Sequence, residues 1–216
     1  MTATLQFGLY LDDAGWRRDA DRGEAARRTL ALAAAADAGG IDMIGASDDP
    51  DSWDAFALLG AAATVASRAR LGPSVANPVH RHPNLIAASI ATLDRLSGGR
   101  AVLGLGRGQP EWYERALGVD ASRPLARVAE TIDLLRQWAA PPYRAASAPG
   151  DVFAVRDWTR TIHPLQAHVP VYLAAAGPQA LALAARAADG VIFNNLTSPA
   201  FMAETIPALR DAARAA

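Results

Sequence analysis

The chain has no cysteine, no lysine, few aromatic residues and almost no net charge. The absence of cysteine among its 216 residues excludes disulfides, thiolate metal ligands and cysteine nucleophiles. All 21 basic residues are arginine, so the lysine-containing phosphate loop of P-loop enzymes is excluded. A net charge of -1 gives no general attraction to nucleic acid or to an anionic membrane, and we expect neither as a partner.

The sequence also lacks a long hydrophobic run. The first eleven residues hold a short apolar stretch with no basic residue before it, and Asp12 and Asp13 follow at once, which does not resemble a signal peptide. The most apolar stretches, 30–38 and 55–66, are too short or too rich in alanine to span a bilayer. We therefore expect a soluble cytoplasmic protein.

What the chain does contain is a regular alternation of apolar runs and helical patterns. Short apolar runs predict buried strands, and longer alanine- and leucine-rich segments that end at glycine or proline predict helices. This alternation, with short connections, predicts an α/β fold with a parallel sheet and crossover helices in a single domain over 1–216. The predicted strands are 5–11, 41–46, 70–76, 101–105, 169–175 and 190–194, and the predicted helices are 24–37, 53–67, 84–96, 123–138, 178–188 and 199–213.

One segment interrupts this pattern. Residues 139–168 contain several prolines and show no clear period. A stretch of this length in a compact α/β domain is either an insertion that covers an active site or a surface loop without a role. Both interpretations stay open, and we predict an irregular insertion here.

Polar and glycine-rich residues follow the predicted strands, where parallel α/β folds place their ligands. The glycines at 104, 106 and 108 would let a flat or anionic ligand approach the backbone closely. They do not form a dinucleotide fingerprint, because Gln109 stands where the third glycine of GxGxxG would fall. At 175–178 a strand ends and a helix opens with Pro178, a natural phosphate site.

Other chemistries are less well supported. The histidines, among them His80 and His82, lack the spacing of metal ligands, and His82 precedes a proline as residues at helix starts do. Asp48 and Asp49 are either paired carboxylates or a turn with a helix cap. Trp53 and Trp112 follow candidate site loops and could flank an aromatic ligand, although simple packing explains either one equally well.

Several motifs together resemble the luciferase-like monooxygenase superfamily, and within it the branch that uses the deazaflavin coenzyme F420 and is close to methylenetetrahydromethanopterin reductase. The match follows the family's order from the first predicted strand to the sixth. The matching motifs are AGGID at 38–42 leading to Ser47 and Asp48, RLGPSVANP at 70–78, RHP at 81–83, ATLDRLSGGR at 91–100, LGLGRG at 103–108, PVYLAAAGP at 170–178 and AADGVI at 187–192.

The resemblance implies a TIM-type (β/α)8 barrel that holds F420, or alternatively FMN, at the carboxyl-terminal mouth of its strands. It implies a non-prolyl cis peptide at Ser74-Val75 that props the cofactor ring, and a phosphate site at 175–179. The cofactor-binding residues carried over from the family are Asp48, Ser74, Val75, Ala76, Asn77, Gly106, Arg107, Gly108, Ala175, Ala176, Gly177, Pro178, Gln179 and Asn194.

The chain departs from the family at three points. The family often has histidine where Asp49 stands and an acidic residue where Gln109 stands, so Asp49 and Gln109 are the candidate catalytic residues at positions whose usual acid or base groups are absent. The chain is also shorter than the family's barrels. We expect about six strand–helix units, with strands seven and eight missing, and either a homodimer or a partner that completes the barrel.

The resemblance implies an oxidoreductase that transfers hydride between a deazaflavin and a small organic substrate. Two alternatives stay open. The first is an FMN-dependent monooxygenase, and the second is a non-catalytic protein that binds a flavin or deazaflavin in a truncated barrel.

Overall fold

The computed structural model describes residues 5–11 and 22–215. Asp12 and Asp13, which follow the first predicted strand, lie outside the described residues. Every structural statement below concerns the described part of the chain.

Six parallel strands form the centre of the molecule. Three of them pair in the order β1-β2-β3 and three in the order β4-β7-β8. Parallel bridges from Leu71 to Ala101 and from Ala76 to Leu105 join the two halves, so the strand order is 1-2-3-4-7-8. The strands are β1 (Gly8–Leu11), β2 (Met43–Ala46), β3 (Arg70–Pro73), β4 (Leu103–Leu105), β7 (Val171–Ala174) and β8 (Gly190–Ile192).

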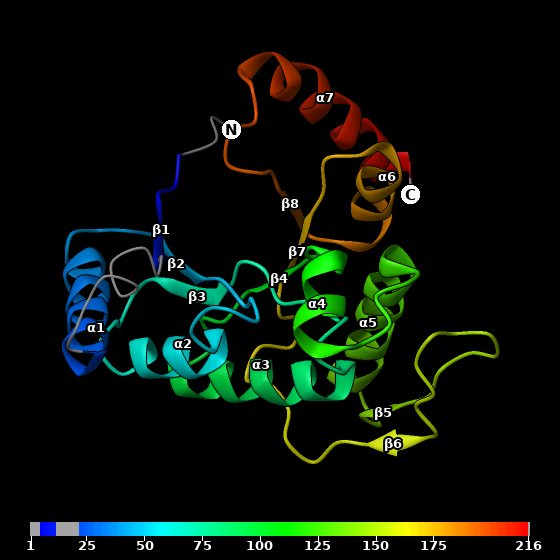
Figure 1. The fold of residues 1–216 in the computed structure, drawn as a ribbon, viewed down its shortest axis with the longest axis horizontal. Coiled ribbons are helices and arrows are strands. Elements are labelled where there is room, and N and C mark those ends of the chain that lie inside the picture. Colours follow the sequence, from blue (N-terminus) through cyan, green and yellow to red (C-terminus); the bar gives the residue numbers. More distant parts are fainter. Residues whose placement is uncertain (1–4, 12–21, 216) are drawn as a thin grey trace.

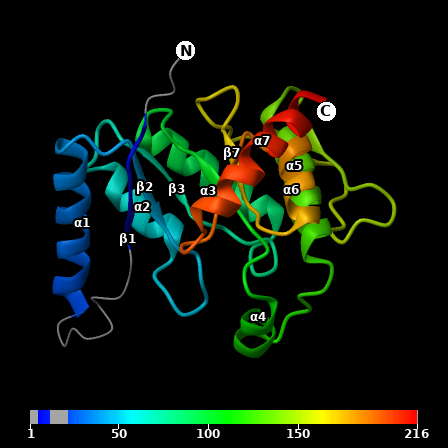
Figure 2. The ribbon, with the colours of Figure 1, turned by 90° about the horizontal axis from the view of Figure 1, so that it is seen from above.

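Helices connect successive strands and pack outside the sheet (Figure 1). The six predicted helices are all present, and the prediction of an α/β fold with parallel strands is confirmed. They are α1 (Arg22–Ala38), α2 (Ala55–Ala63), α3 (Pro83–Ser97), α5 (Pro124–Ala139), α6 (Pro178–Ala187) and α7 (Pro199–Ala215). A seventh helix, α4 (Pro110–Leu117), was not predicted. Figure 2 shows it standing off the rest of the molecule on two connecting segments.

The core lies between the strands and the helices. Ile44, Leu71, Leu103 and Leu173 from four neighbouring strands are at most 1% exposed. Side chains on both faces of a parallel sheet are buried, which explains why these strands read as continuous apolar runs. Within the described residues, β1 and β8 pair with a neighbour on one side only.

Two helix ends bear on the sequence predictions. The ring Nδ1 of His82 accepts a hydrogen bond from the Asn84 amide at the start of α3, so its predicted position at a helix start is confirmed. The N-cap of α2 is Asp54, which accepts from the Ala57 amide, and not the Asp48–Asp49 pair. The helix-cap interpretation of that pair is therefore wrong, because α2 begins several residues later.

Residues 139–168 are more ordered than predicted. They contain a small antiparallel pair, β5 (Arg144–Ala145) and β6 (Trp158–Thr159), and Phe153 and Val155 pack with Trp138 in a cluster on α3 and α5. Buried Asp94 on α3 accepts hydrogen bonds from the amides of Leu165 and Gln166. The rest of the segment has no regular secondary structure, as predicted for an irregular insertion, although its irregularly spaced apolar side chains still form a cluster.

No helix in the described part of the chain is both long enough and apolar enough to cross a membrane.

Candidate functional site

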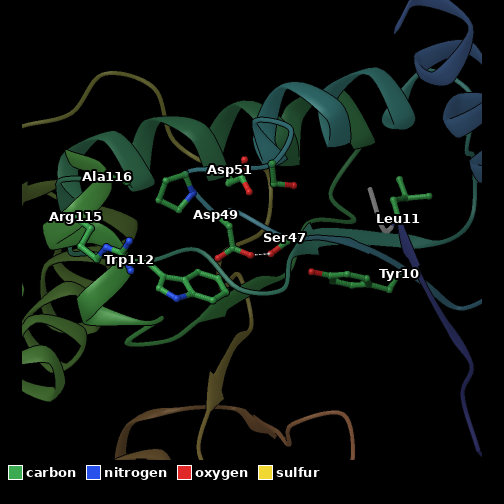
Figure 3. Close-up of a pocket in the computed structure, with 10 residues that line it drawn as sticks. Tyr10, Leu11, Ser47, Asp49, Asp51, Trp112, Arg115 and Ala116 are labelled. Carbon is green, nitrogen blue, oxygen red and sulfur yellow. Dashed lines mark hydrogen bonds between the residues drawn. The ribbon is translucent and has the colours of Figure 1, made fainter. Parts of the chain in front are cut away.

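A cavity of about 660 Å³ opens at the carboxyl ends of β1 and β2 (Figure 3). Its volume lies in the range of pockets that hold small organic ligands. Two aromatic side chains, Tyr10 and Trp112, lie on either side of Ser47 and Asp49. The lining residues are Tyr10, Leu11, Ser47, Asp49, Pro50, Asp51, Ser52, Trp112, Arg115 and Ala116.

Of the two predicted catalytic residues, the structure places only Asp49 at this cavity. Its carboxylate accepts a hydrogen bond from the Ser47 hydroxyl, and it is half-buried. Gln109 is exposed at the N-cap of α4 and is not among the lining residues. Both assignments remain predictions, and the geometry favours Asp49.

Asp48 has different partners from Asp49 and is buried, at 3% exposure. Arg81 donates to both of its oxygens, at 2.7 and 2.8 Å, and His80 Nε2 lies 3.2 Å from Oδ2. Burial raises the pKa of Asp48, but the hydrogen bonds from His80 and Arg81 lower it more, so its pKa lies below the ordinary value. Asp48 therefore holds the loop after β3 in place, and the two adjacent aspartates do not act as one pair.

The loop after β3 carries the predicted cis peptide, and that prediction is confirmed at Ser74-Val75. Asn77, two residues further on, is fully buried. Its Oδ1 accepts from the Val79 amide at 2.7 Å, whereas its Nδ2 meets no acceptor in hydrogen-bond geometry. A buried amide nitrogen without an acceptor is uncommon and is a feature of sites that receive a polar group.

The structure gives a packing reason for the glycines in and after β4. A Cβ at Gly106 would lie 2.6 Å from Val75 Cγ2, and one at Gly104 would meet the Pro73 carbonyl. The chain itself therefore fills the space beside these two glycines, and the close approach of a ligand to this backbone stays a prediction. Gly108 has φ +57°, and a Cβ there would collide with Asn77 and Tyr113.

Tyr113 is the buried neighbour of Trp112 on α4 and is 1% exposed. Burial and the charge of Asp49 raise the pKa of Tyr113 to about 12, so its hydroxyl stays protonated at neutral pH. His80 stacks on its ring, with centroids 5.2 Å apart and an angle of 25°.

The predicted phosphate site lies at the start of α6. Gly177 is the N-cap, Pro178 opens the helix, and no side chain caps the free backbone amides. A Cβ at Gly177 would meet nothing within 4 Å, and residues 176–179 are exposed. Arg107 and Asn194, after β4 and β8, are also exposed. The predicted positions thus share one edge of the sheet, although only Asp49 among them lines the cavity.

Part of the cavity wall could not be predicted from the sequence. Tyr10 belongs to a predicted strand, but its exposure at the strand end carries no sequence signal. Arg115 and Ala116 lie on the unpredicted helix α4. Trp112, for which a ligand-flanking role and simple packing were both open, is 51% exposed and lines the cavity.

Comparison with known proteins agrees with this architecture. The family described as luciferase-like monooxygenase matches residues 5–216. The 5,10-methylenetetrahydromethanopterin reductase of Archaeoglobus fulgidus is 34% identical over 155 residues, which cover 72% of this chain and 45% of that protein. The F420-dependent glucose-6-phosphate dehydrogenase of Beutenbergia cavernae is 36% identical over 203 residues, covering 88% of this chain and 59% of that protein.

Among solved structures, the monooxygenase RslO1 from Streptomyces bottropensis superposes with a TM-score of 0.82 at 26% identity. The superposition covers 98% of this chain and 66% of that one. The chain spans about half the length of the curated relatives it matches. Its α/β fold is similar to that of luciferase-like TIM-barrel enzymes.

Proposed function

The chain belongs to the luciferase-like monooxygenase family, and from this we propose that it is an oxidoreductase that binds the deazaflavin coenzyme F420 and passes hydride between it and a small organic substrate. The observation that carries the proposal is the cavity at the carboxyl ends of the strands, with Asp49 between two aromatic side chains. Relatives named as F420-dependent, at 34% to 36% identity, favour this coenzyme.

The residues at this edge suit a ligand that has both an aromatic and an anionic part. Arg107 is exposed, and none of the described residues forms an ion pair with it. The uncapped start of α6 presents backbone amides and the positive end of the helix dipole. Asp49 and Asp51 line the cavity and would repel an anion. We therefore assign the anionic part to Arg107 and α6.

The buried polar groups beside α4 give a second test of fit. Asn77 Nδ2 has a hydrogen to donate, but Asn77 is fully buried beside Gly108 and Tyr113 and does not line the cavity, so a carbonyl oxygen of a bound ring would reach it only if this wall moved. The aromatic faces of Tyr10 and Trp112 offer apolar walls for a ring or for the substrate. These observations fit a deazaflavin as well as a flavin.

When bound, the deazaflavin would accept or donate the hydride. The protein's part is to hold a proton and orient the substrate. Asp49 lines the cavity, and Ser47 donates a hydrogen bond that fixes its carboxylate. In the proposed oxidation of an alcohol, Asp49 takes the hydroxyl proton as hydride leaves the carbon. Arg115, on the opposite wall, orients a polar group of the substrate.

A second candidate is a monooxygenase that uses FMN. It is supported by the fold shared with the monooxygenase RslO1 at 26% identity. A protein that binds the cofactor without catalysis is the third. The three differ in which cofactor binds and in whether Asp49 affects turnover.

The test is a binding titration of the purified chain with F420 and, separately, with FMN, followed by absorbance and fluorescence. We expect F420 to bind more tightly than FMN. Arg107→Gln should weaken F420 binding, whereas Asp49→Asn should leave binding intact and lower the rate of F420 reduction with a responsive alcohol. Tighter FMN binding would favour the monooxygenase, and failure of both cofactors to bind would refute a cofactor-dependent function.

We also propose that the outer edges of β1 and β8 are covered by further polypeptide, either a second copy of this chain or a partner. Parallel edges with free backbone groups are prone to association. Near β1, Leu5 and Phe7 are 82% and 66% exposed, and Leu196 after β8 is fully exposed. Size-exclusion chromatography with light scattering tests this. A monomer of the purified chain at micromolar concentration would contradict the second copy, and a monomer in cell extract as well would contradict the partner.

A further inference from the structure

The wall of the cavity formed by α4 is attached to the molecule at one point. Of the eight residues of α4, only Tyr113 is buried. Its neighbours Trp112 and Arg115 face the cavity, and Trp112 is 51% exposed. Figure 2 shows α4 set apart from the sheet and from the other helices. The position of this wall therefore depends on what holds Tyr113.

The Tyr113 hydroxyl lies against the Asn77 amide and the Gln109 backbone, and His80 holds the ring itself. The His80 ring stacks on Tyr113 at a centroid distance of 5.2 Å. Its Nε2 lies 3.2 Å from the buried Asp48 carboxylate, which Arg81 fixes in turn. His80 is thus the link between a buried ion-pair network in the body of the protein and the single anchor of α4.

A glycine in the left-handed region flanks α4 on each side. Gly108 has φ +57° and Gly118 has φ +64°. Such positions can absorb large backbone rotations, and hinges of mobile segments are built at positions of this kind. A Cβ at Gly108 would collide with the Tyr113 side chain, so only glycine at this position lets Tyr113 stay buried as it is in the structure.

The contact around Tyr113 is incompletely satisfied. In this cluster His80 Nδ1 is buried without a partner among the described residues, and Asn77 Nδ2 lies against the Tyr113 hydroxyl without reaching good hydrogen-bond geometry. Buried polar atoms without partners weaken the arrangement that buries them. In the closed position, with Tyr113 buried against His80, the ring stack stabilises α4 and the burial of polar groups destabilises it. This balance is expected of a segment that opens.

We propose that α4 is a movable wall of the cavity, hinged at Gly108 and Gly118, and that His80 is the positioning residue that latches it through Tyr113. His80 then controls the exchange of ligand without touching it. The inference that ligand exchange depends on this latch rests on the proposed function, whereas the latch itself does not.

The latch is tested by hydrogen–deuterium exchange of the amides at 114–118 in the full chain. A helix of eight residues is not stable alone in water, so α4 frays once Tyr113 is released. The Gly118 amide donates to the Glu114 carbonyl at 3.0 Å, and its exchange reports this fraying. His80→Ala removes the stacking ring, and we expect exchange at 114–118 to rise about tenfold, in line with the strength of aromatic pairs. His80→Phe keeps the stacking ring but loses both the unpartnered nitrogen and the contact with Asp48, so it should restore slow exchange in part.

A matched control exists elsewhere in the chain. His163 also stacks on a tyrosine, Tyr143, at 3.7 Å between centroids, and its Nδ1 is also buried without a partner. His163→Ala should leave exchange at 114–118 unchanged. The latch is refuted if His80→Ala has no effect at 114–118, if it raises exchange equally in α3 and α5, or if these amides are already unprotected in the wild type.

A second readout separates this proposal from the proposed function. Stopped-flow binding of F420 should show that His80→Ala raises both the association and the dissociation rates several-fold, with a smaller change in Kd. Slow exchange partly restored by His80→Phe, together with no F420 binding at all, would support the latch and refute the cofactor. F420 binding with unaltered rates in His80→Ala would refute the role in ligand exchange.

Discussion

Asp37, at the end of α1, carries the sharpest stability prediction. It is 5% exposed and accepts hydrogen bonds from three successive backbone amides. Oδ2 accepts from Ser67 at 2.8 Å, and Oδ1 accepts from Arg68 at 3.0 Å and from Ala69 at 2.7 Å. One carboxylate thus ties the end of α1 to the segment that leads into β3. We expect Asp37→Asn to destabilise the protein, because an amide cannot accept all three bonds.

The magnitude follows from the pKa. Burial alone would raise the pKa of Asp37, but the amide hydrogen bonds lower it from 3.8 to about 2. This difference corresponds to about 2.4 kcal/mol of folding free energy. Since α1 lies at the outside of the molecule, water screens part of the interaction, and we expect about 1–2 kcal/mol. For a chain of this length, that lowers Tm by about 2–8 °C.

The assay is urea unfolding of the wild type and of Asp37→Asn at several pH values. A lowered pKa gives stability that is present above the unfolded value of 3.8 and is lost as pH falls toward the folded value of about 2. The difference in unfolding free energy between the two proteins should therefore be largest at pH 7 and become smaller below about pH 4. Asp133→Asn, an exposed position on α5, is the matched control and should show no difference. Equal stability of wild type and Asp37→Asn at pH 7, or a difference that stays constant to pH 3, would refute the reasoning.

Three further predictions concern the site. Asp48→Asn removes the buried carboxylate that Arg81 contacts, while Arg81 keeps its ion pair with Asp54, so we expect a loss of about 1.5–3 kcal/mol in chemical denaturation, and no loss at all would contradict the pairing. Gly108→Ala forces a side chain into Tyr113 at positive φ, so exchange of the α4 amides should rise and unfolding free energy should fall by at least about 1 kcal/mol, as calorimetry can check. Arg107→Gln should leave Tm within about 1 °C of the wild type, since the residue is exposed, while the Kd for F420 rises about tenfold. A fall in Tm with no change in Kd would show that Arg107 supports the fold and does not bind the anionic part of F420.

The elements with a strong period could be predicted from the sequence. All six strands and six helices of the α/β repeat are present within a few residues of their predicted bounds. Helix α4 was missed because it is only eight residues long, so its apolar positions, Trp112, Tyr113, Ala116 and Leu117, do not repeat often enough to show a helical period. The pair β5–β6 was missed because it consists of two-residue strands among prolines.

The location of the candidate site could be predicted from the sequence, but the contacts of its residues could not. Polar residues at strand ends pointed to the correct edge of the sheet, and the cis peptide at Ser74-Val75 followed from the family resemblance. Local sequence could not show that Asp48 is neutralised by Arg81, which is 33 positions away. Nor could it distinguish a glycine that admits a ligand from Gly106, which the side chain of Val75 requires.

That last contact has an evolutionary consequence. A Cβ at position 106 would lie 2.6 Å from a methyl group of Val75 and 3.2 Å from the Cβ of Ala174. The combined side-chain volume at positions 75 and 106 is therefore limited, because a larger residue at one position requires a smaller residue at the other. In descendants of this chain the two positions should drift together, with alanine at 106 arising only after a smaller residue at 75.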